Sequence, residues 1–576
     1  MKHPVRALLA LLLALLMLLA GCGEEPPATT PNSPDNGGSG TNPPATDTTF
    51  KKTESYMPTE VFTQMKSYFE STSTGFYPYD DRAYAPLVST DVFAISDCTV
   101  KSITIPVFST GKADKNGDFT FSIYILHNAW SLLRTDMAEP DDPIVIKVNG
   151  AEYGLEENQL IRKFVKVDLT EYDIVLTDKE TLGFSHVDDT LIPARVLTKG
   201  TVNDAGKEKH APAKYMIDAW DVVGYYYYNT TVNAETGKAT GFSYTDNSLL
   251  FDFELERTYE SEAAYNAMIA AKAQADADYA AKLAAVKAAY GDKCFSLMGD
   301  SISTFSGVTN NPAVHSSLVH NRVHYSINTT VYDYTKTYWG KLSVDTDMDL
   351  CVINAWSGGK VYGGNNDLID NMLTRSYNLS TNAGKNPDII FLYYGINDML
   401  NSPSSANSKS ESDYTGNLPT GDLYQRLQSK SAGQTDKQVV EAWFAEVRQK
   451  ATLAGYDPAD PDTIVRGETY ITWEGAYALA LQNIKNTHSE AEVFCFTLAE
   501  CNHGSSGQPR MDKANTIIRA LAEYFEVGLV DQSKCEINKQ NSHIYARDAY
   551  GLHPNGRGHA AVTKLIVETL YEKLPK

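Results

Sequence analysis

The sequence predicts two folded parts, an all-β part followed by an α/β domain built on a parallel sheet. Three observations predict this arrangement. Apolar residues alternate with period two between about 51 and 257, an alanine-rich helical pattern covers 258–290, and short apolar runs alternate with helical stretches over 291–576. A chain of 576 residues is also too long for one ordinary core, so we expect about two main domains.

The chain begins with a segment typical of secretion. Residues 1–22 hold a short basic region, a Leu/Ala run and the sequence LAGC. The apolar run over 7–20 is shorter than the roughly 20 residues of a membrane-spanning helix. LAGC resembles the bacterial lipobox, which implies cleavage before Cys22 and lipid attachment to its thiol; the alternative is an ordinary signal peptide. We expect an extracytoplasmic, lipid-anchored protein whose Pro/Thr/Gly/Ser-rich residues 23–50 form a disordered tether at the bacterial surface or periplasm-facing membrane.

Residues 51–257 carry the strand pattern. Phe119, Phe121, Ile123 and Ile125 alternate with polar or amphipathic residues, and Asn116-Gly117 and Asn149-Gly150 are typical of hairpin turns. We expect a jelly-roll-like sandwich. The run Tyr225–Tyr228 fits either a sugar-stacking platform or a strand with two half-buried faces.

The second part begins after a predicted linking helix over 258–290, which ends at Gly291. Residues 402–470 interrupt the later alternation with a polar loop and a short helix at 439–447, and we expect this insertion to form a lid or substrate wall. The predicted strands are Phe295–Met298, Leu350–Ile353, Ile389–Tyr394, Val493–Leu498 and Val527–Val530, and the predicted helices lie near 474–486, 511–525 and 556–574.

Composition narrows the possible partners. A formal net charge of -22 repels polyanions, so we expect no nucleic-acid partner and a neutral or weakly charged substrate. Six cysteines besides Cys22 lack CxxC spacing, which favours buried free thiols over a disulfide framework and gives no support for a zinc site. Asp114–Asp118 has alternate oxygen ligands but lacks the late Glu of a calcium loop, so a plain turn is favoured. We therefore expect no metal and no cofactor.

Four polar motifs fall where predicted strands end and helices begin. The carboxyl edge of a parallel sheet is open, and helix N-termini there present unpaired N–H groups, so functional residues gather at that edge. The motifs, in chain order, are Gly299-Asp300-Ser301-Ile302-Ser303, Asn354-Ala355-Trp356-Ser357-Gly358-Gly359, Tyr394-Gly395-Ile396-Asn397-Asp398 and Gly551-Leu552-His553-Pro554-Asn555.

These four blocks, in this order, resemble those of the SGNH (GDSL-like) hydrolases over about 291–576. The resemblance implies a flavodoxin-like, three-layer α/β/α fold and ester hydrolysis through an acyl-enzyme, without a cofactor. Ser301 would be the nucleophile and His553 the general base, which a serine hydroxyl needs at neutral pH. The implied oxyanion hole consists of the Ser301 N–H, the Asn397 amide and a glycine N–H, that of Gly358 in preference to Gly359.

One position departs from the family pattern. The family places Asp three residues before the histidine, where this chain has Tyr550, and the nearest carboxylate is Asp548. Three arrangements remain: Asp548 reaches His553, a backbone carbonyl orients the ring in a Ser-His dyad, or the enzyme is impaired. We favour a working dyad or an Asp548 triad.

Two further residues are candidates for contact with the substrate. Trp356 adjoins the predicted oxyanion glycine, and His503 follows a predicted strand at the catalytic edge. The alternatives are a core tryptophan and a loop histidine without a role.

These features predict a serine esterase acting on acylated carbohydrate, with acetyl as the expected acyl group. A lipase, thioesterase or peptidoglycan O-acetyl esterase would use the same residues with a different pocket. A non-catalytic glycan-binding lipoprotein is the alternative that the Tyr550 departure leaves open.

Overall fold

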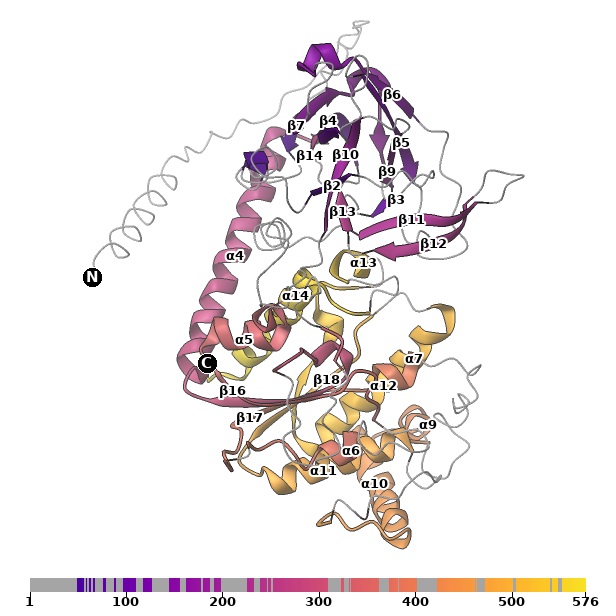
Figure 1. Cartoon of the computed structure of the whole chain (residues 1–576). Helices are drawn as coiled ribbons and strands as arrows, with labels where there is room; N and C mark the ends of the chain where they lie inside the picture. Colours follow the sequence, from indigo (N-terminus) through magenta and orange to yellow (C-terminus); the bar gives the residue numbers. More distant parts are fainter. Residues whose placement is uncertain are drawn as a thin grey trace, which may run out of the picture. The chain divides into compact units, whose positions relative to one another are not determined.

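The computed structural model describes residues 49–55, strands and short segments between 59 and 249, and most of 252–575 (Figure 1). The longest stretches outside this description are 1–48, 127–143, 198–224, 309–322 and 401–421. The predicted signal peptide, Cys22 and residues 23–48 of the predicted tether therefore lie outside the described residues, whereas Phe50, the last residue of that tether, already begins a strand, Phe50–Ser55. Among the helices that are described, none has both the length and the apolar character of a membrane span.

The N-terminal part is antiparallel β structure, as predicted. Its largest sheet has the order β1-β14-β4-β10-β13, with β2 paired to β10 and with β7 and β8 paired to β4. The described residues also form two three-stranded sheets, β12-β11-β3 and β6-β5-β9. The strands are β1 (Phe50–Ser55), β2 (Phe76–Pro78), β3 (Leu87–Ser89), β4 (Cys98–Ser109), β5 (Phe119–Leu126), β6 (Ile144–Val148), β7 (Arg162–Asp168), β8 (Val175–Leu176), β9 (Thr181–His186), β10 (Leu191–Leu197), β11 (Tyr225–Val232), β12 (Ala239–Thr245), β13 (Asn247–Leu249) and β14 (Asp252–Tyr259).

The period-two pattern builds the core of this part. Phe119 of β5 lies opposite Val148 of β6, and Phe121 lies opposite Ile146. All four side chains are buried, because alternate residues of a strand point to the same face.

The predicted hairpin at Asn149-Gly150 is wrong. Asn149 instead caps a 3₁₀ turn, Gly150–Tyr153, by accepting the Ala151 N–H at 3.2 Å. Strand β6 pairs with the earlier β5, while the next strand, β7, pairs with β4, so the turn carries the chain from one sheet to another. Asn116-Gly117 and the side chains of Tyr225–Tyr228 lie outside the described residues.

Helix α4 (Glu262–Tyr290) joins the β part to the α/β domain. Ser261 caps its first turn by accepting the Ala264 N–H at 3.1 Å, and the helix ends at Gly291, whose N–H bonds to Lys287. Val286 and Tyr290, near its end, are buried in the core of the α/β domain. The C-terminal part of α4 is therefore an element of that domain.

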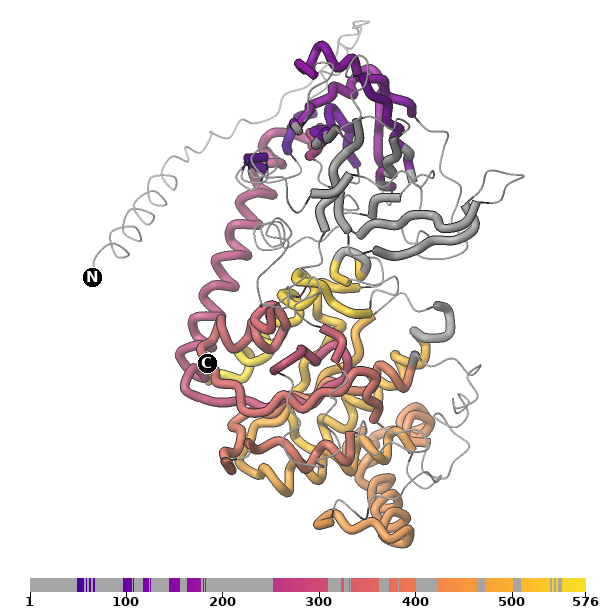
Figure 2. Tube along the Cα trace, viewed as in Figure 1, coloured from indigo at the N-terminus to yellow at the C-terminus, as the bar shows by residue number. Residues whose placement is uncertain are grey.

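The α/β domain holds a five-stranded parallel sheet between two helical layers, as predicted. The strand order is β16-β15-β17-β18-β19. Helices α4, α5 and α14 pack together on one face, and α6, α10, α11 and α12 pack on the other (Figures 1 and 2). The elements are β15 (Cys294–Gly299), α5 (Tyr338–Thr346), β16 (Asp349–Ala355), α6 (Met372–Arg375), β17 (Ile389–Tyr393), α7 (Ile396–Leu400), α9 (Leu423–Gln428), α10 (Asp436–Leu453), α11 (Trp473–Thr487), β18 (Glu492–Phe496), α12 (Gly504–Phe525), β19 (Gly528–Val530), α13 (Ser542–Tyr545) and α14 (Gly556–Lys573).

The strand order places three of the four motifs side by side. The chain leaves β15 for β16 on one side and then crosses to β17 on the other, which makes the end of β15 the switch point of the sheet. Gly299, at the end of β15, lies level with Ala355 of β16 and with Tyr393 of β17. The first three motifs therefore begin at the same height on one edge.

The described part of the 402–470 insertion contains α9 and a longer helix than expected, α10. A capping box formed by Thr435 and Gln438 starts α10, and Trp443 and Phe444 on its inner face are buried in the domain core. Helix α10 is therefore a core-packing helix rather than a lid. Residues 402–421, 461–462 and 464–470 of the insertion lie outside the described residues, and the lid or substrate wall stays a prediction.

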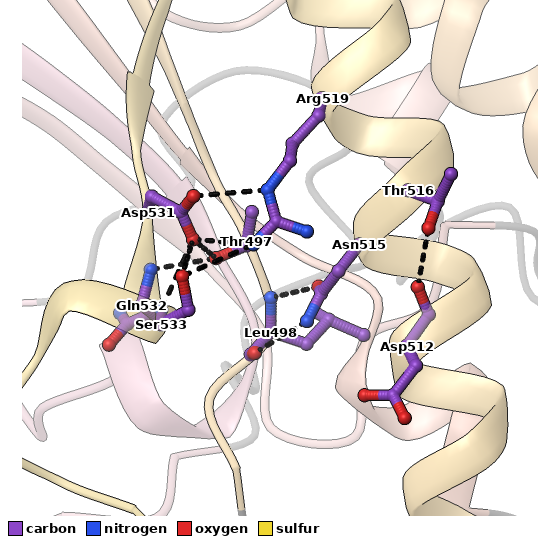
Figure 3. Close-up of polar contacts among 9 residues, drawn as sticks. All are labelled: Thr497, Leu498, Asp512, Asn515, Thr516, Arg519, Asp531, Gln532 and Ser533. Carbon is purple, nitrogen blue, oxygen red and sulfur yellow. Dashed lines mark hydrogen bonds and ion pairs between the residues drawn. The ribbon is translucent and has the colours of Figure 1, made fainter.

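A polar network joins α12 to the carboxyl ends of β18 and β19 (Figure 3). Arg519 of α12 binds Asp531 through two hydrogen bonds, of 2.7 and 3.0 Å, and Asp531 also accepts the Thr497 hydroxyl at 3.1 Å. Asn515 exchanges two hydrogen bonds with the backbone of Leu498. This edge of the sheet is therefore held by side chains as well as by the strand ladder.

The five cysteines among the described residues form no disulfide. Cys294 and Cys351, on neighbouring strands, have their sulfur atoms 2.6 Å apart. Burial raises the pKa of Cys495 to about 12, which keeps that thiol protonated and unreactive. Cys501 lies outside the described residues.

Candidate active site

Ser301 opens a short 3₁₀ turn, Ser301–Ser303, directly after β15. The Asp300 carboxylate accepts the Ile302 N–H at 3.1 Å, and the Asp300 carbonyl accepts the Ser303 N–H at 3.0 Å. A side chain at Gly299 would overlap Ser303, so this tight turn requires glycine there. The turn brings Ser301 to the carboxyl edge of the sheet.

His553, close to the C-terminal end of the domain's sequence, lies next to Ser301 in the folded structure. Its Nε2 lies 2.9 Å from Ser301 Oγ, within hydrogen-bonding distance. Asn555, two residues later, caps the N-terminus of α14. Its side chain accepts the Gly558 N–H at 3.0 Å, and its backbone N–H donates to the Tyr545 carbonyl at 2.9 Å. The structure thus joins the first and fourth motifs.

The second motif forms a tight turn after β16. The Gly359 N–H donates to the Trp356 carbonyl at 2.8 Å, and Gly358 has φ of +85°. A positive φ at the third residue is the requirement of a type II turn, which explains glycine at 358. Because the turn uses the Gly359 N–H, the geometry favours Gly358 as the donor available to a ligand.

The third motif bonds to the second. Asn397 Nδ2, in the first turn of α7, donates to the Gly359 carbonyl at 3.0 Å. Asp398 is buried, and its carboxylate accepts the Val361 N–H at 2.9 Å. Since the Trp356 N–H also donates to the Gly299 carbonyl at 3.0 Å, the first three motifs form one bonded unit.

The Asp300 carboxyl is fully buried beside the serine turn. Burial raises its pKa, the Ile302 N–H opposes that rise, and the charge of Asp398 adds to it, so that the pKa lies near 7. Within the described residues, Asp300 Oδ2 has no hydrogen-bond partner. An ionised Asp300 is therefore poorly compensated.

Trp356 is half-buried beside the predicted oxyanion glycine. The guanidinium carbon of Arg375 lies 5.2 Å from the centre of its ring, and Arg375 is itself buried and donates to Asn354 Oδ1. This cation–π contact supports the Trp356 ring on one face.

The structure brings together Ser301, His553, Asn397, Gly358 and Trp356, all of which the sequence had singled out. His503, Asp548 and Tyr550 lie outside the described residues, so the group that orients His553 stays a prediction. Sequence reasoning missed His324, whose ring lies against that of His553. No motif marks His324. Within the described residues, no group of three or more His, Cys, Asp or Glu side chains could hold a metal ion.

Comparison with known proteins identifies one family and a set of solved structures. Residues 293–443 match the family described as GDSL-like Lipase/Acylhydrolase, a range that includes Ser301, Gly358 and Asn397. No curated protein matches the chain.

Among the similar solved structures, a family two carbohydrate esterase from Clostridium thermocellum is 11% identical with a TM-score of 0.28, covering 87% of this chain and 95% of that one. A protein from Bacteroides ovatus described as a GDSL-like lipase is 17% identical with a TM-score of 0.28, covering 48% and 96%. An acetyl xylan esterase is 15% identical with a TM-score of 0.25, covering 49% and 100%. At these values the likeness supports no conclusion about activity.

The family match and the Ser301–His553 contact agree on the kind of domain present. The match accounts for three of the four motifs, and the structure adds the fourth through the 2.9 Å contact of His553 with Ser301. The C-terminal half of the chain therefore contains a GDSL-like lipase/acylhydrolase domain, which is a kind of carboxylic ester hydrolase domain.

Proposed function

We propose that the chain hydrolyses acyl esters, acetyl esters above all, through an acyl-enzyme on Ser301 with His553 as general base and acid. The observation that carries the proposal is the 2.9 Å distance between His553 Nε2 and Ser301 Oγ. A serine hydroxyl is a weak nucleophile at neutral pH and becomes reactive only when an adjacent base takes its proton.

The reaction then runs in two halves. His553 Nε2 takes the Ser301 proton as Oγ attacks the ester carbonyl carbon. The tetrahedral intermediate collapses, the bond to the alcohol oxygen breaks, and His553 gives the proton to the departing alcohol. In the second half, His553 deprotonates a water that attacks the acyl-enzyme, and the carboxylic acid leaves as the proton returns to Ser301 Oγ.

We assign the oxyanion hole to the N–H groups of Ser301 and Gly358 and to the Asn397 side-chain amide. One support is that the strands leading to these three residues end in register, at Gly299, Ala355 and Tyr393. The other is the 3.0 Å hydrogen bond from Asn397 Nδ2 to the carbonyl of Gly359, the residue next to Gly358. Each such donor is typically worth about 10²- to 10³-fold in rate.

For the alcohol half of the ester we propose a carbohydrate. Trp356, whose ring Arg375 supports on one face, offers an aromatic surface beside the proposed oxyanion glycine, and aromatic faces suit the apolar faces of sugar rings. The chain's net charge of -22 favours a neutral substrate such as an acetylated neutral polysaccharide. His503 is proposed as a further contact on the strength of its position after β18.

We also propose that the protein is exported and lipid-anchored through Cys22. The support is the LAGC sequence at 19–22 behind a basic and apolar leader, followed by the polar residues 23–50. An esterase held at the cell surface would meet polymers too large to enter the cell.

The proposed activity is tested with Ser301→Ala. We expect its turnover of p-nitrophenyl acetate to fall by at least about 10³-fold, because the nucleophile is lost, and fluorophosphonate labelling of the wild type to map to Ser301. Ser306→Ala is the matched control, since Ser306 is an exposed serine on the same loop, and it should keep wild-type turnover. Unchanged turnover in Ser301→Ala would contradict the proposal. Acetate release from acetylated xylan, compared with release from acetylated peptidoglycan, then tests the carbohydrate assignment.

A further inference from the structure

A second histidine lies face to face with the proposed general base. The ring centres of His324 and His553 are 3.7 Å apart and their planes differ by 13°. Aromatic pairs usually lie with centres about 4.5 to 7 Å apart, so these two rings overlap almost completely. The edge of His553 meanwhile points at Ser301. One histidine thus covers the face of the ring while the serine meets its edge.

The backbone of His324 is tied to the nucleophile turn. The His324 N–H donates to Thr304 Oγ1 at 2.8 Å. The same hydroxyl donates to the Ser301 carbonyl at 2.9 Å, and Thr304 is fully buried. Two hydrogen bonds therefore link the His324 backbone to the backbone of Ser301 through one fully buried side chain.

The next residue, Tyr325, ties His324 to the loop of the general base. The buried Tyr325 hydroxyl donates to the Pro554 carbonyl at 2.9 Å, directly after His553. Its ring meets His324 edge to face, with centres 4.9 Å apart, and its carbonyl accepts the Ser306 N–H at 3.0 Å. Residues 324 and 325 therefore bridge the two chain segments that carry the proposed catalytic pair.

We propose that His324 is a positioning residue for His553. A flat ring held against the imidazole prevents it from tilting about its side-chain bonds, so Nε2 stays aimed at Ser301 Oγ while His553 gains and returns a proton. Stacking restrains the plane of the ring and leaves the choice of tautomer to whatever group binds Nδ1. The inference rests on the proposed role of His553 as general base.

The test compares three substitutions in the full chain: His324→Ala, His324→Leu and His324→Phe. Leu and Phe both fill the space, but only Phe restores a flat face. With p-nitrophenyl acetate we expect kcat to fall about 10-fold or more in the Ala and Leu variants, with KM within about twofold of wild type, and the Phe variant to stay within about threefold of wild-type kcat. The rate of fluorophosphonate labelling of Ser301 should follow the same order.

The control is His488→Ala. His488 ends α11, just before β18 begins, and so lies at the amino edge of the sheet, away from the site. It is a buried histidine whose loss should leave kcat unchanged. Circular dichroism and thermal melts of all variants separate loss of folding from loss of rate.

Two results would overturn the proposal. One is a folded His324→Ala or His324→Leu variant with wild-type kcat. The other is a His324→Phe variant as slow as the Leu variant, which would mean that the flat ring is not what matters. Either result leaves the proposed esterase activity standing, provided that the wild type turns over the ester and Ser301→Ala does not.

Discussion

Asp300 combines a position next to the proposed nucleophile with a fully buried carboxyl group. Its pKa in the folded protein lies near 7, well above its ordinary value of 3.8. At low pH such a carboxyl group is protonated in both the folded and the unfolded state, so its ionisation does not affect the free energy of unfolding. As the pH rises from about 4 to 7, the unfolded state loses the proton more readily, and the fold becomes less stable. The shift corresponds to a cost on the order of 4 kcal/mol above that range.

Asp300→Asn should therefore change how stability depends on pH. Asn keeps an oxygen for the Ile302 N–H but carries no charge, so the variant avoids the cost that grows from pH 4 to 7. We expect its melting temperature, relative to wild type, to rise between pH 4 and pH 7 and to level off above that range. If the difference in melting temperature between the two proteins stays constant over this pH range, the pKa of Asp300 is not raised by its burial.

At the scale of single residues, sequence could identify what the motifs mark and nothing more. Ser301, Asn397 and His553 each sit in a short motif at a strand end or helix start. The preference for Gly358 over Gly359 came from the family resemblance, and the φ of +85° and the hydrogen bond that occupies the Gly359 N–H supply its physical reason. His324 meets His553 by ring stacking between distant segments, a contact that leaves no local pattern in the sequence.

At the scale of elements, the join between α12 and the end of β19 gives the clearest electrostatic case. Burial by itself would raise the pKa of Asp531, but the hydrogen bonds from Arg519 and Ser533 outweigh it and lower the pKa to about 2. A lowered carboxyl pKa stabilises the fold at pH values above 3.8, the ordinary pKa of the group. This contribution is lost as the pH falls toward 2.

Arg519→Met should destabilise the protein at pH 7 by about 1 to 2 kcal/mol, since the Arg519 side chain is partly exposed and solvent screens the pair. The difference from wild type should shrink between pH 4 and pH 2, where Asp531 takes up a proton. Urea unfolding at several pH values measures both effects. Lys534→Met, which removes one partner of the exposed 3.7 Å pair with Glu572, should change stability by less than about 0.5 kcal/mol. Equal effects of the two substitutions would show that the Arg519–Asp531 join carries no special weight.

The sequence predicted the elements of the α/β domain well because its strands are continuous apolar runs buried on both faces. All five predicted strands lie within a residue or two of β15 to β19. The errors came where a local signal has two meanings. Asn149-Gly150 fits a hairpin, but Asn also caps helical turns, and tertiary pairing decided for the cap. Helix α10, with 18 residues, is twice as long as its apolar stretch indicated, since a capping box at Thr435 starts it three residues earlier and the helix runs on to Leu453.

At the scale of the whole molecule, the net charge of -22 should act on the substrate before binding. The Debye length falls from about 30 Å at 0.01 M salt to about 10 Å at 0.1 M, so added salt screens long-range repulsion. We expect kcat/KM for p-nitrophenyl hemisuccinate, an anionic ester, to rise over this range, and that for neutral p-nitrophenyl acetate to stay constant. A fall for the anionic ester would reveal a positive local field at the site that the net charge hides.

The packing of α4 against α14 has a consequence for engineering. Lys282 of α4 bonds to Glu568 of α14 at 3.1 Å, and both helices end at the amino edge of the sheet, since each runs antiparallel to the strands. The first strand of the α/β domain therefore starts close to the point where its last helix stops. A linker from the end of α14 back to the part of α4 that precedes Val286 would keep the buried end of α4 in the domain, and new ends could be opened at the exposed turn over 430–434, between α9 and α10. The domain is thus a candidate for circular permutation, in which Ser301 and His553 would exchange their order along the chain and keep their places in space.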